Sequence, residues 1–319
     1  ADGKPDIIAT NWGLNSKYRA TQEHALKLFH GDFDNNGTLD MIQVYFDTTL
    51  QKEVPETSLA LLGPAMPFVL SRIKSFEHFS TASIEEILGN RLRQAKLLSA
   101  NTLASMVFVN TGQRFSAQYL PPAAQFAPAF SAGVTDFDGD GHEDVFLSQN
   151  FFATNIETAR NDGGRGLWLK GDGTGALQPV PGHVSGVTVY GEQRGAAFGD
   201  FNNDGRIDLA VSQNGAETKL YKNIRAKKGI RVRLIGPQGN MDAIGATVRL
   251  LFGDRYGPAR EVQAGSGYAA QNSSVLVFGA QEQPTGIWIR WPDGKETIQK
   301  KEIVANGIVV MYNKPTQRD

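Results

Sequence analysis

The sequence predicts an all-β protein in two parts, a series of similar short-stranded sheets followed by a small β-sandwich. Three observations predict this fold. Glycine accounts for 35 of the 319 residues, one acidic motif occurs three times, and the C-terminal part alternates strand-like runs with turns. Frequent glycine indicates many turns and therefore many short strands. We expect two domains, over residues 1–225 and 226–319.

The acidic motif begins at Asp32, Asp136 and Asp200 and aligns without gaps as DFDNNGTLD, DFDGDGHED and DFNNDGRID. Each copy has Asp or Asn at positions 1, 3 and 5, glycine at position 6 and Asp at position 9. An apolar run with the character of a β-strand follows position 9 directly. We therefore expect each motif to form a loop that connects two strands.

This spacing is typical of a calcium-binding loop. Oxygen ligands at alternate positions of a tight turn converge on one point, and six to eight of them suit calcium. Position 12 of an EF-hand would be Glu, whereas Gln43, Leu147 and Val211 stand there, so these loops are not EF-hands. The alternative is that each Asp-Gly pair marks a hairpin turn and no more, but one such pair would suffice for a turn.

The predicted ligands are the side chains at positions 1, 3, 5 and 9 and the backbone carbonyl at position 7. They are Asp32, Asp34, Asn36, Thr38 and Asp40; Asp136, Asp138, Asp140, His142 and Asp144; Asp200, Asn202, Asp204, Arg206 and Asp208. The phenylalanine at position 2 (Phe33, Phe137 and Phe201) is expected to pack in the core between sheets.

The first residues, ADGKPDIIAT, match the second half of the same motif, with Asp2 and Asp6 in register. The first two ligand positions would precede residue 1. We therefore expect a truncated N-terminal repeat in which Asp2 and Asp6 bind metal weakly or not at all.

These motifs resemble FG-GAP/VCBS repeats, the calcium-loop blades of integrin-type β-propellers. Three further segments resemble the strand and turn that end such blades, namely FVNTGQRF (108–115), LWLKGDGTGAL (167–177) and LYKN (220–223). The resemblance implies a propeller that binds Ca²⁺ outside the cytoplasm.

Residues 64–105 lack the acidic motif and are expected to form a short helical insertion. Ser83 and Glu86 form a capping box, and Leu92, Ala95 and Leu98 continue an apolar helical face. Gly89 is expected to split the segment into two short helices. The insertion either packs against the propeller or contacts a ligand or partner.

Residues 229–313 contain five strand-like runs separated by Gly or Pro turns and predict a β-sandwich. The segments GNMDAIGATVRL (239–250), REVQAGSGYAAQNSSVLVFG (260–279) and WPDG (291–294) resemble the ASPIC/UnbV domain. The pairing of both families resembles the cartilage acidic protein family. Polar residues either line a ligand site here or stabilise turns; they are Asn240, Asp242, Ser266, Tyr268, Gln271 and Asn272. Since this segment has no acidic loop, it is expected to unfold almost independently of a chelator.

Composition excludes several classes of function. The net charge of -1 gives no basic surface for nucleic acid, no apolar run is long enough to span a membrane, and cysteine is absent. No signal peptide is visible, but the family resemblance implies a secreted, periplasmic or cell-surface protein.

Two functions remain open. The first is a ligand-binding or cell-adhesion module for a glycan or protein partner. The second is a polysaccharide lyase or hydrolase built on a propeller. The binding module is favoured because most acidic residues belong to the loops and no catalytic residue can be assigned from a motif. The sequence does not define an oligomeric state.

Overall fold

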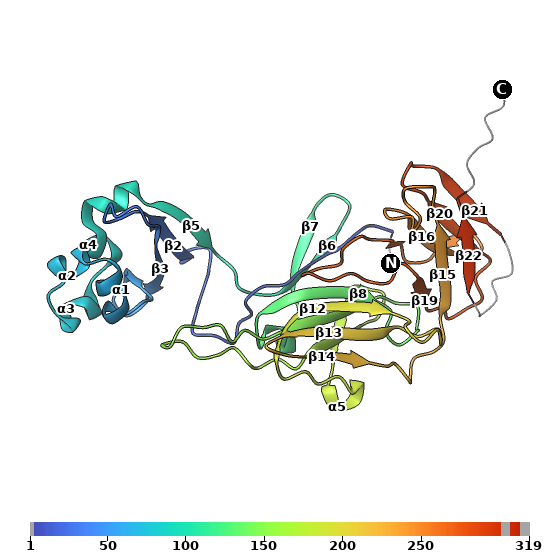
Figure 1. The fold of residues 1–319 in the computed structure, drawn as a ribbon, viewed down its shortest axis with the longest axis horizontal. Coiled ribbons are helices and arrows are strands. Elements are labelled where there is room, and N and C mark those ends of the chain that lie inside the picture. The colour runs from blue at the N-terminus through green and yellow to red at the C-terminus, as the bar shows by residue number, and fades with distance from the viewer. Residues whose placement is uncertain (1–2, 301–306, 313–319) are drawn as a thin grey trace, which may run out of the picture. The chain divides into compact units, whose positions relative to one another are not determined.

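The computed structural model describes residues 3–300 and 307–312. Strands predominate, and the chain forms two compact units (Figure 1). The first unit combines Ala1–Asn15 with Ala104–Asp319, and the second is Ser16–Leu103. Among the described residues, no helix is long and apolar enough to cross a membrane.

Three antiparallel sheets of the first unit have their strands in chain order, and residues 16–103 of the other unit intervene in the sequence between β1 and β6. Their orders are β1-β6-β7, β11-β10-β9-β8 and β12-β13-β14. The strands are β1 (Ile7–Ala9), β6 (Met106–Asn110), β7 (Phe115–Tyr119), β8 (Ala129–Thr135), β9 (Asp144–Gln149), β10 (Leu167–Gly171), β11 (Leu177–Val180), β12 (Glu192–Gly199), β13 (Asp208–Asn214) and β14 (Ala216–Tyr221). Two short helical segments, η2 (Pro122–Gln125) and α5 (Gly182–Ser185), connect them. This succession of small meanders is the arrangement of propeller blades, as the sequence predicts.

Aromatic side chains join the sheet β8–β11 to the sheet β12–β14. Phe137, Phe146 and Phe198 are buried in one cluster and contact one another edge to face. Gly133 in β8 leaves room for this packing, because a Cβ there would lie 1.8 Å from the ring of Phe198. The core between these two sheets therefore depends on a glycine opposite an aromatic ring.

The C-terminal strands form two sheets around one core and confirm the predicted sandwich. The sheet orders are β19-β15-β22 and β17-β16-β20-β21, with β18 also paired to β16. Val232, Val248, Ile289 and Trp291 are buried in the shared core. The strands are β15 (Ile230–Ile235), β16 (Thr247–Phe252), β17 (Arg255–Tyr256), β18 (Arg260–Glu261), β19 (Leu276–Phe278), β20 (Gly286–Arg290), β21 (Glu296–Gln299) and β22 (Ile308–Met311).

The second unit is a four-stranded sheet covered by short helices. Its strand order is β4-β3-β2-β5, and the helices contribute Leu62, Val69 and Ile87 to a core shared with Phe29 and Ile42. The elements are β2 (Leu26–Gly31), β3 (Asp40–Asp47), β4 (Lys52–Pro55), α1 (Leu59–Ala65), α2 (Phe68–Arg72), α3 (Phe76–Thr81), α4 (Ile84–Leu88), η1 (Gly89–Gln94) and β5 (Lys96–Ala100).

The helical prediction for residues 64–105 is correct in part. The Ser83–Glu86 capping box is present, and α4 ends where η1 begins at Gly89. However, Leu98 lies in β5, opposite Leu28 of β2. Pairing with the free edge of β2 outweighs the helical spacing of the apolar residues. The compact inserted unit is also longer than the predicted insertion, because it includes the loop that begins at Asp32.

The three phenylalanines at position 2 do not share one environment. Phe33 and Phe137 are buried, at 3% and 8% exposure. Phe137 packs between two sheets as predicted, whereas Phe33 lies in the core between one sheet and the short helices of the second unit. Phe201 is 54% exposed, so the prediction is wrong there. The strands after β14 form the sandwich instead of another sheet of the series, and Phe201 therefore has no following blade to pack against.

Candidate metal centres

The three acidic loops occupy the same place in three sheets. Each joins two adjacent antiparallel strands, β2 to β3, β8 to β9 and β12 to β13, and position 9 is the first residue of the second strand. The predicted connection between strands is therefore correct for all three. We refer to these loops as loop 32, loop 136 and loop 200, after the residue at position 1.

The backbone of the loops turns twice through the left-handed region. Glycine at position 6 has φ of 82°, 88° and 82° in loops 32, 136 and 200, as the sequence predicts. Position 4 also has positive φ, at 59° for Asn35, 74° for Gly139 and 61° for Asn203. Asn and Gly are the residues that adopt this conformation at least cost. Position 4 is not among the positions predicted from the sequence, although its Asn/Gly composition was the available signal.

The carboxylate at position 1 holds the turn together by accepting two backbone N–H groups. Asp32, Asp136 and Asp200 each accept from the amides of positions 5 and 6, at 2.8–3.1 Å. The side-chain oxygen at position 5 accepts from the amide of position 7, at 2.7–3.0 Å. These hydrogen bonds orient the acidic side chains toward the inside of the turn.

The carboxylate at position 9 closes each loop. Asp40, Asp144 and Asp208 accept the amide of the position-2 phenylalanine at 2.9, 2.9 and 3.2 Å. Two of them also accept an amide near the end of the third strand, Asp144 from Gly171 at 2.8 Å and Asp208 from Asn223 at 2.7 Å. Position 9 therefore links the acidic loop to the rest of its sheet.

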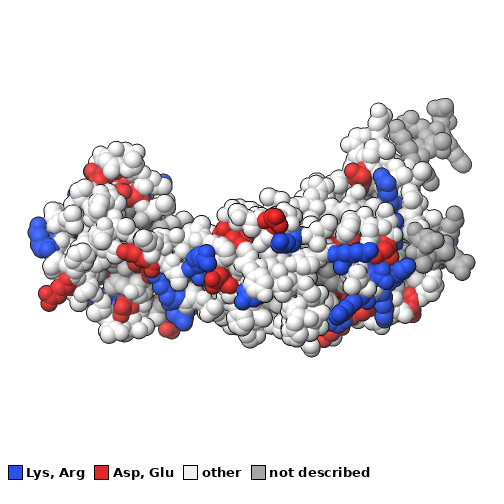
Figure 2. Space-filling view, turned by 60° about the horizontal axis from the view of Figure 1, so that its bottom comes forward, with Lys and Arg blue, Asp and Glu red and all other residues white. Residues whose placement is uncertain are grey.

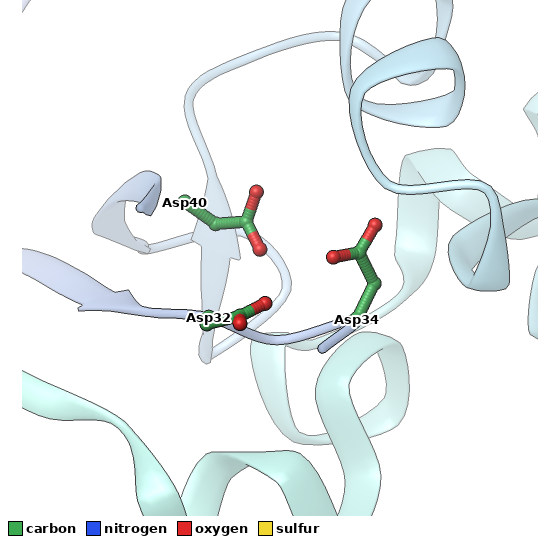
Figure 3. Close-up of side chains that lie close together, drawn as sticks. All are labelled: Asp32, Asp34 and Asp40. Atoms are coloured by element: carbon green, nitrogen blue, oxygen red, sulfur yellow. The ribbon is translucent and has the colours of Figure 1, made fainter. Parts of the chain in front are cut away.

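In loops 32 and 136 the acidic side chains converge as an oxygen-based metal site requires, whereas the three carboxylates of loop 200, all within the described residues, do not form such a group. Asp32, Asp34 and Asp40 each offer a carboxylate oxygen, and these oxygens lie within 4.8 Å of one another, with the three side chains turned toward a common point (Figure 3). Asp136, Asp138 and Asp144 satisfy the same criterion. The donors are oxygens at alternating positions, so both loops fit calcium.

Burial makes the acidic cluster of loop 136 unfavourable in the absence of a cation. Asp144 is fully buried. Burial, together with the nearby carboxylates of Asp138 and Asp136, raises the pKa of Asp144 to about 7. Burial likewise raises the pKa of Asp136, Asp40 and Asp208. A bound divalent cation would offset this cost by compensating the negative charge.

Basic side chains form ion pairs with the acidic residues of two loops, whereas at loop 32 Arg91 Nε donates to the backbone carbonyl of Phe33 at 2.8 Å. Lys170 contacts Asp138 and lies 2.8 Å from Asp140 in loop 136. In loop 200, Arg231 Nε lies 2.8 Å from Asp200 Oδ2, and Arg206 lies 3.3 Å from Asp204. Within residues 3–300 and 307–312, no Lys or Arg forms an ion pair with Asp32, Asp34 or Asp40.

The truncated N-terminal motif keeps one feature of a complete loop. Asp6 Oδ1 accepts the amide of Asn110 at 2.8 Å, as position 9 does near the third strand in loops 136 and 200. Asp2 lies outside the described residues. The low affinity expected for Asp2 and Asp6 stays a prediction.

Two polar residues of the C-terminal segment stabilise the fold. Asn240 makes two hydrogen bonds to the backbone of Ile244, and Asn272 Oδ1 accepts the amide of Phe198 at 3.0 Å. These contacts favour the structural interpretation of these two polar residues over a ligand site. Figure 2 shows both basic and acidic side chains on one face of the molecule.

Comparison with protein families defines the class of protein. The FG-GAP-like repeat family matches residues 136–211, and the ASPIC and UnbV family matches residues 236–316. The first match includes loops 136 and 200, and the second includes the sandwich strands from β16 onward. The chain therefore contains segments similar to FG-GAP-like repeats and to an ASPIC/UnbV domain, as the resemblance in the sequence predicts.

The chain is also similar to individual proteins. The chain is similar to cartilage acidic protein 1 of Xenopus tropicalis, at 30% identity over 111 residues, which cover 33% of this chain and 17% of the relative. It is also similar to human cartilage acidic protein 1, at 24% identity over 186 residues, which cover 55% of this chain and 26% of the relative. The alignments thus span about a quarter of these relatives or less.

Proposed function

We propose that this protein is an extracytoplasmic calcium-binding propeller module that binds a glycan or protein ligand, as an adhesion module does. The observation that carries the proposal is the repeated geometry of loops 32, 136 and 200, with the same left-handed residues and hydrogen bonds in all three. Turn formation alone would not require four oxygen-bearing side chains in register each time.

Calcium would be held by the oxygens of positions 1, 3, 5, 7 and 9, and it would supply positive charge that stabilises the loops. The matches to FG-GAP-like repeats and to cartilage acidic protein 1 support a structural metal and a location outside the cytoplasm. Calcium sites of extracellular modules bind at about 10⁻⁴ to 10⁻³ M. At a concentration of about 100 times the dissociation constant, one site adds roughly 2.7 kcal/mol to the free energy of unfolding.

A cavity beside loop 136 supports ligand binding. Its volume is about 430 Å³, and Phe137, Asp138, Trp168 and Tyr221 are among its lining residues. Ligand sites typically combine aromatic walls with a few polar groups in a space of this size. We propose this cavity as the place where part of a ligand binds.

The polysaccharide-cleaving alternative receives less support. A second cavity, of about 500 Å³, is lined by two carboxylates outside the metal ligands, Glu143 and Glu261. Arg260 forms two contacts with Glu143, at 2.9 and 3.1 Å. Glycosidase chemistry generally needs two available carboxylates, and the pairing with Arg260 leaves one.

Isothermal titration calorimetry tests the proposed metal binding. Calcium is titrated into chelator-treated full-length chain, and thermal unfolding is followed in parallel. We expect heat of binding and a higher melting temperature, both reduced in Asp138→Ala. Absence of heat together with identical melting in calcium and chelator would contradict the proposal.

A further inference from the structure

The ASPIC/UnbV sandwich contacts loop 136 at close range. Gly279, which follows β19, lies so near Asp136 that a Cβ on Gly279 would be 1.9 Å from Asp136 Oδ2. The same Cβ would be 2.7 Å from the carbonyl carbon of Gly139. Arg260 of β18 binds both carboxylate oxygens of Glu143, which lies between positions 7 and 9 of the loop. The sandwich is therefore in direct contact with loop 136.

Loop 200 makes a second set of contacts with the sandwich. Arg231 of β15 forms the ion pair with Asp200, whose side chain is fully buried, and also donates to Asn203 Oδ1. The amide of Gly229 donates to the carbonyl of Gly205 at 2.7 Å. Three residues of loop 200 thus contact the start of the sandwich. They are the proposed metal ligand Asp200, Asn203 with its positive φ, and Gly205 at position 6.

The connecting segment before β15 runs against both loops. The amide of Lys227 donates to the carbonyl of Asp138 at 3.0 Å, and Arg206 Nε donates to the carbonyl of Ala226 at 2.7 Å. Gly139 is similarly confined, since a Cβ there would lie 2.5 Å from the carbonyl oxygen of Lys227. Most of these contacts use backbone groups, so they require the loops to keep their conformation.

We infer that the ASPIC/UnbV sandwich is docked on loops 136 and 200 and that calcium binding, chiefly in loop 136, controls the docking, because Arg231 already pairs with Asp200 in loop 200. The inference rests on the proposed function. Without a cation, the acidic side chains of each loop repel one another and favour opening of the loop. Opening displaces the carbonyls of Asp138 and Gly205, and with them the hydrogen bonds that hold Lys227 and Gly229.

This inference replaces the expectation that the C-terminal segment is indifferent to a chelator. That expectation followed from the absence of an acidic loop within the segment, but the structure places two loops in direct contact with it. Loop 32 belongs to the other compact unit and provides an internal comparison, because it has the same motif.

Hydrogen exchange of two amides tests the inference. The amides of Lys227 and Gly229 are measured at single-residue resolution in the full chain, with calcium or with a chelator. The amide of Trp291, which donates to Lys295 within the sandwich at 2.8 Å, serves as the control. Coupling between sites is typically about 5- to 150-fold, and we expect calcium to slow exchange at Lys227 and Gly229 by a factor in this range while leaving Trp291 unchanged.

Matched variants test which loop causes the calcium response of amide exchange. Asp138→Asn and Asp34→Asn change the same motif position in loops 136 and 32. We expect Asp138→Asn to remove most of the calcium response at Lys227 and Asp34→Asn to retain it. Lys170→Gln removes the ion pair with Asp138 while leaving every oxygen ligand, and it should also retain the response.

The outcomes separate the two proposals. If calorimetry detects calcium binding but exchange at Lys227 and Gly229 does not change in the wild type, the docking inference is wrong and the metal-binding proposal stands. If Asp34→Asn abolishes the response as fully as Asp138→Asn does, control by loop 136 is likewise refuted. If no calcium binds, the proposed function fails, and the inference fails with it.

Discussion

The rings of Phe137 and Phe198 meet edge to face, with their centroids 5.2 Å apart, and join the sheet β8–β11 to the sheet β12–β14. Phe137 and Phe201 occupy the same motif position but differ in burial, at 8% and 54% exposure. We expect Phe137→Ala to lower the free energy of unfolding by about 3 kcal/mol or more, because it leaves a cavity. Phe201→Ala should change it by about 0.5 kcal/mol or less.

Urea unfolding in calcium measures both values. Equal effects of Phe137→Ala and Phe201→Ala would show that the packing between these two sheets does not stabilise the fold as described.

The glycine opposite this aromatic cluster gives a second prediction. A methyl group on Gly133 would overlap the ring of Phe198, and we expect Gly133→Ala to destabilise the protein by about 1–3 kcal/mol through overpacking. Gly265→Ala is the control, because the nearest atom to its added Cβ is 4.0 Å away. Thermal unfolding of Gly133→Ala, Gly265→Ala and the wild type measures the difference in stability. A Gly133→Ala protein as stable as the wild type would contradict the packing.

Glu192 gives a pH-dependent prediction. Burial alone would raise its pKa, but hydrogen bonds from the Phe152 amide, Asn214 and Arg194 outweigh burial and lower the pKa below 4.5. A lowered pKa in the folded state stabilises the fold above about pH 4.5, and this stabilisation is lost as the pH falls through the lowered pKa. Glu192→Gln should therefore cost about 1–3 kcal/mol at pH 7.

The difference between wild type and Glu192→Gln should shrink as the pH falls below about 4. Denaturant unfolding of both proteins at pH 7 and at a pH below about 4 measures this difference. A difference that is constant with pH would exclude ionic stabilisation by Glu192.

Loops 32 and 200 should differ in affinity although each has three carboxylates. Arg231 and Arg206 already pair with Asp200 and Asp204, whereas loop 32 has no ion pair within the described chain. Positive charge a few ångströms away opposes cation binding. We expect loop 200 to bind calcium about tenfold more weakly than loop 32, which corresponds to about 1.4 kcal/mol.

Double variants isolate the two loops for calorimetry. Asp34→Asn with Asp138→Asn leaves loop 200 intact, and Asp138→Asn with Asp204→Asn leaves loop 32 intact. Equal affinities in these two proteins would rule out the influence of the arginines.

The local features that the sequence predicted depend on neighbours along the chain. The acidic spacing, the turn at Gly37, Gly141 and Gly205, and the capping box at Ser83 all involve residues a few positions apart, so a local pattern was enough to identify them. The sandwich was predictable for a related reason, because alternating apolar residues mark each strand.

The features that the sequence did not predict depend on contacts between distant residues. Lys96–Ala100 pairs with β2, about seventy residues earlier in the chain, and this pairing decides its conformation. The exposure of Phe201 depends on which sheet follows β14. The contacts of Arg231 and Gly279 with the acidic loops likewise join segments whose proximity no local pattern indicates.

The central claim, that the acidic loops are calcium sites, is tested most directly by a crystal structure of the full chain grown in millimolar calcium, with anomalous scattering used to identify the ion. We expect anomalous peaks enclosed by Asp32, Asp34 and Asp40 and by Asp136, Asp138 and Asp144, with a weaker peak beside Asp200. Well-ordered loops without any peak, in crystals that contain calcium, would show that the loops are not calcium sites.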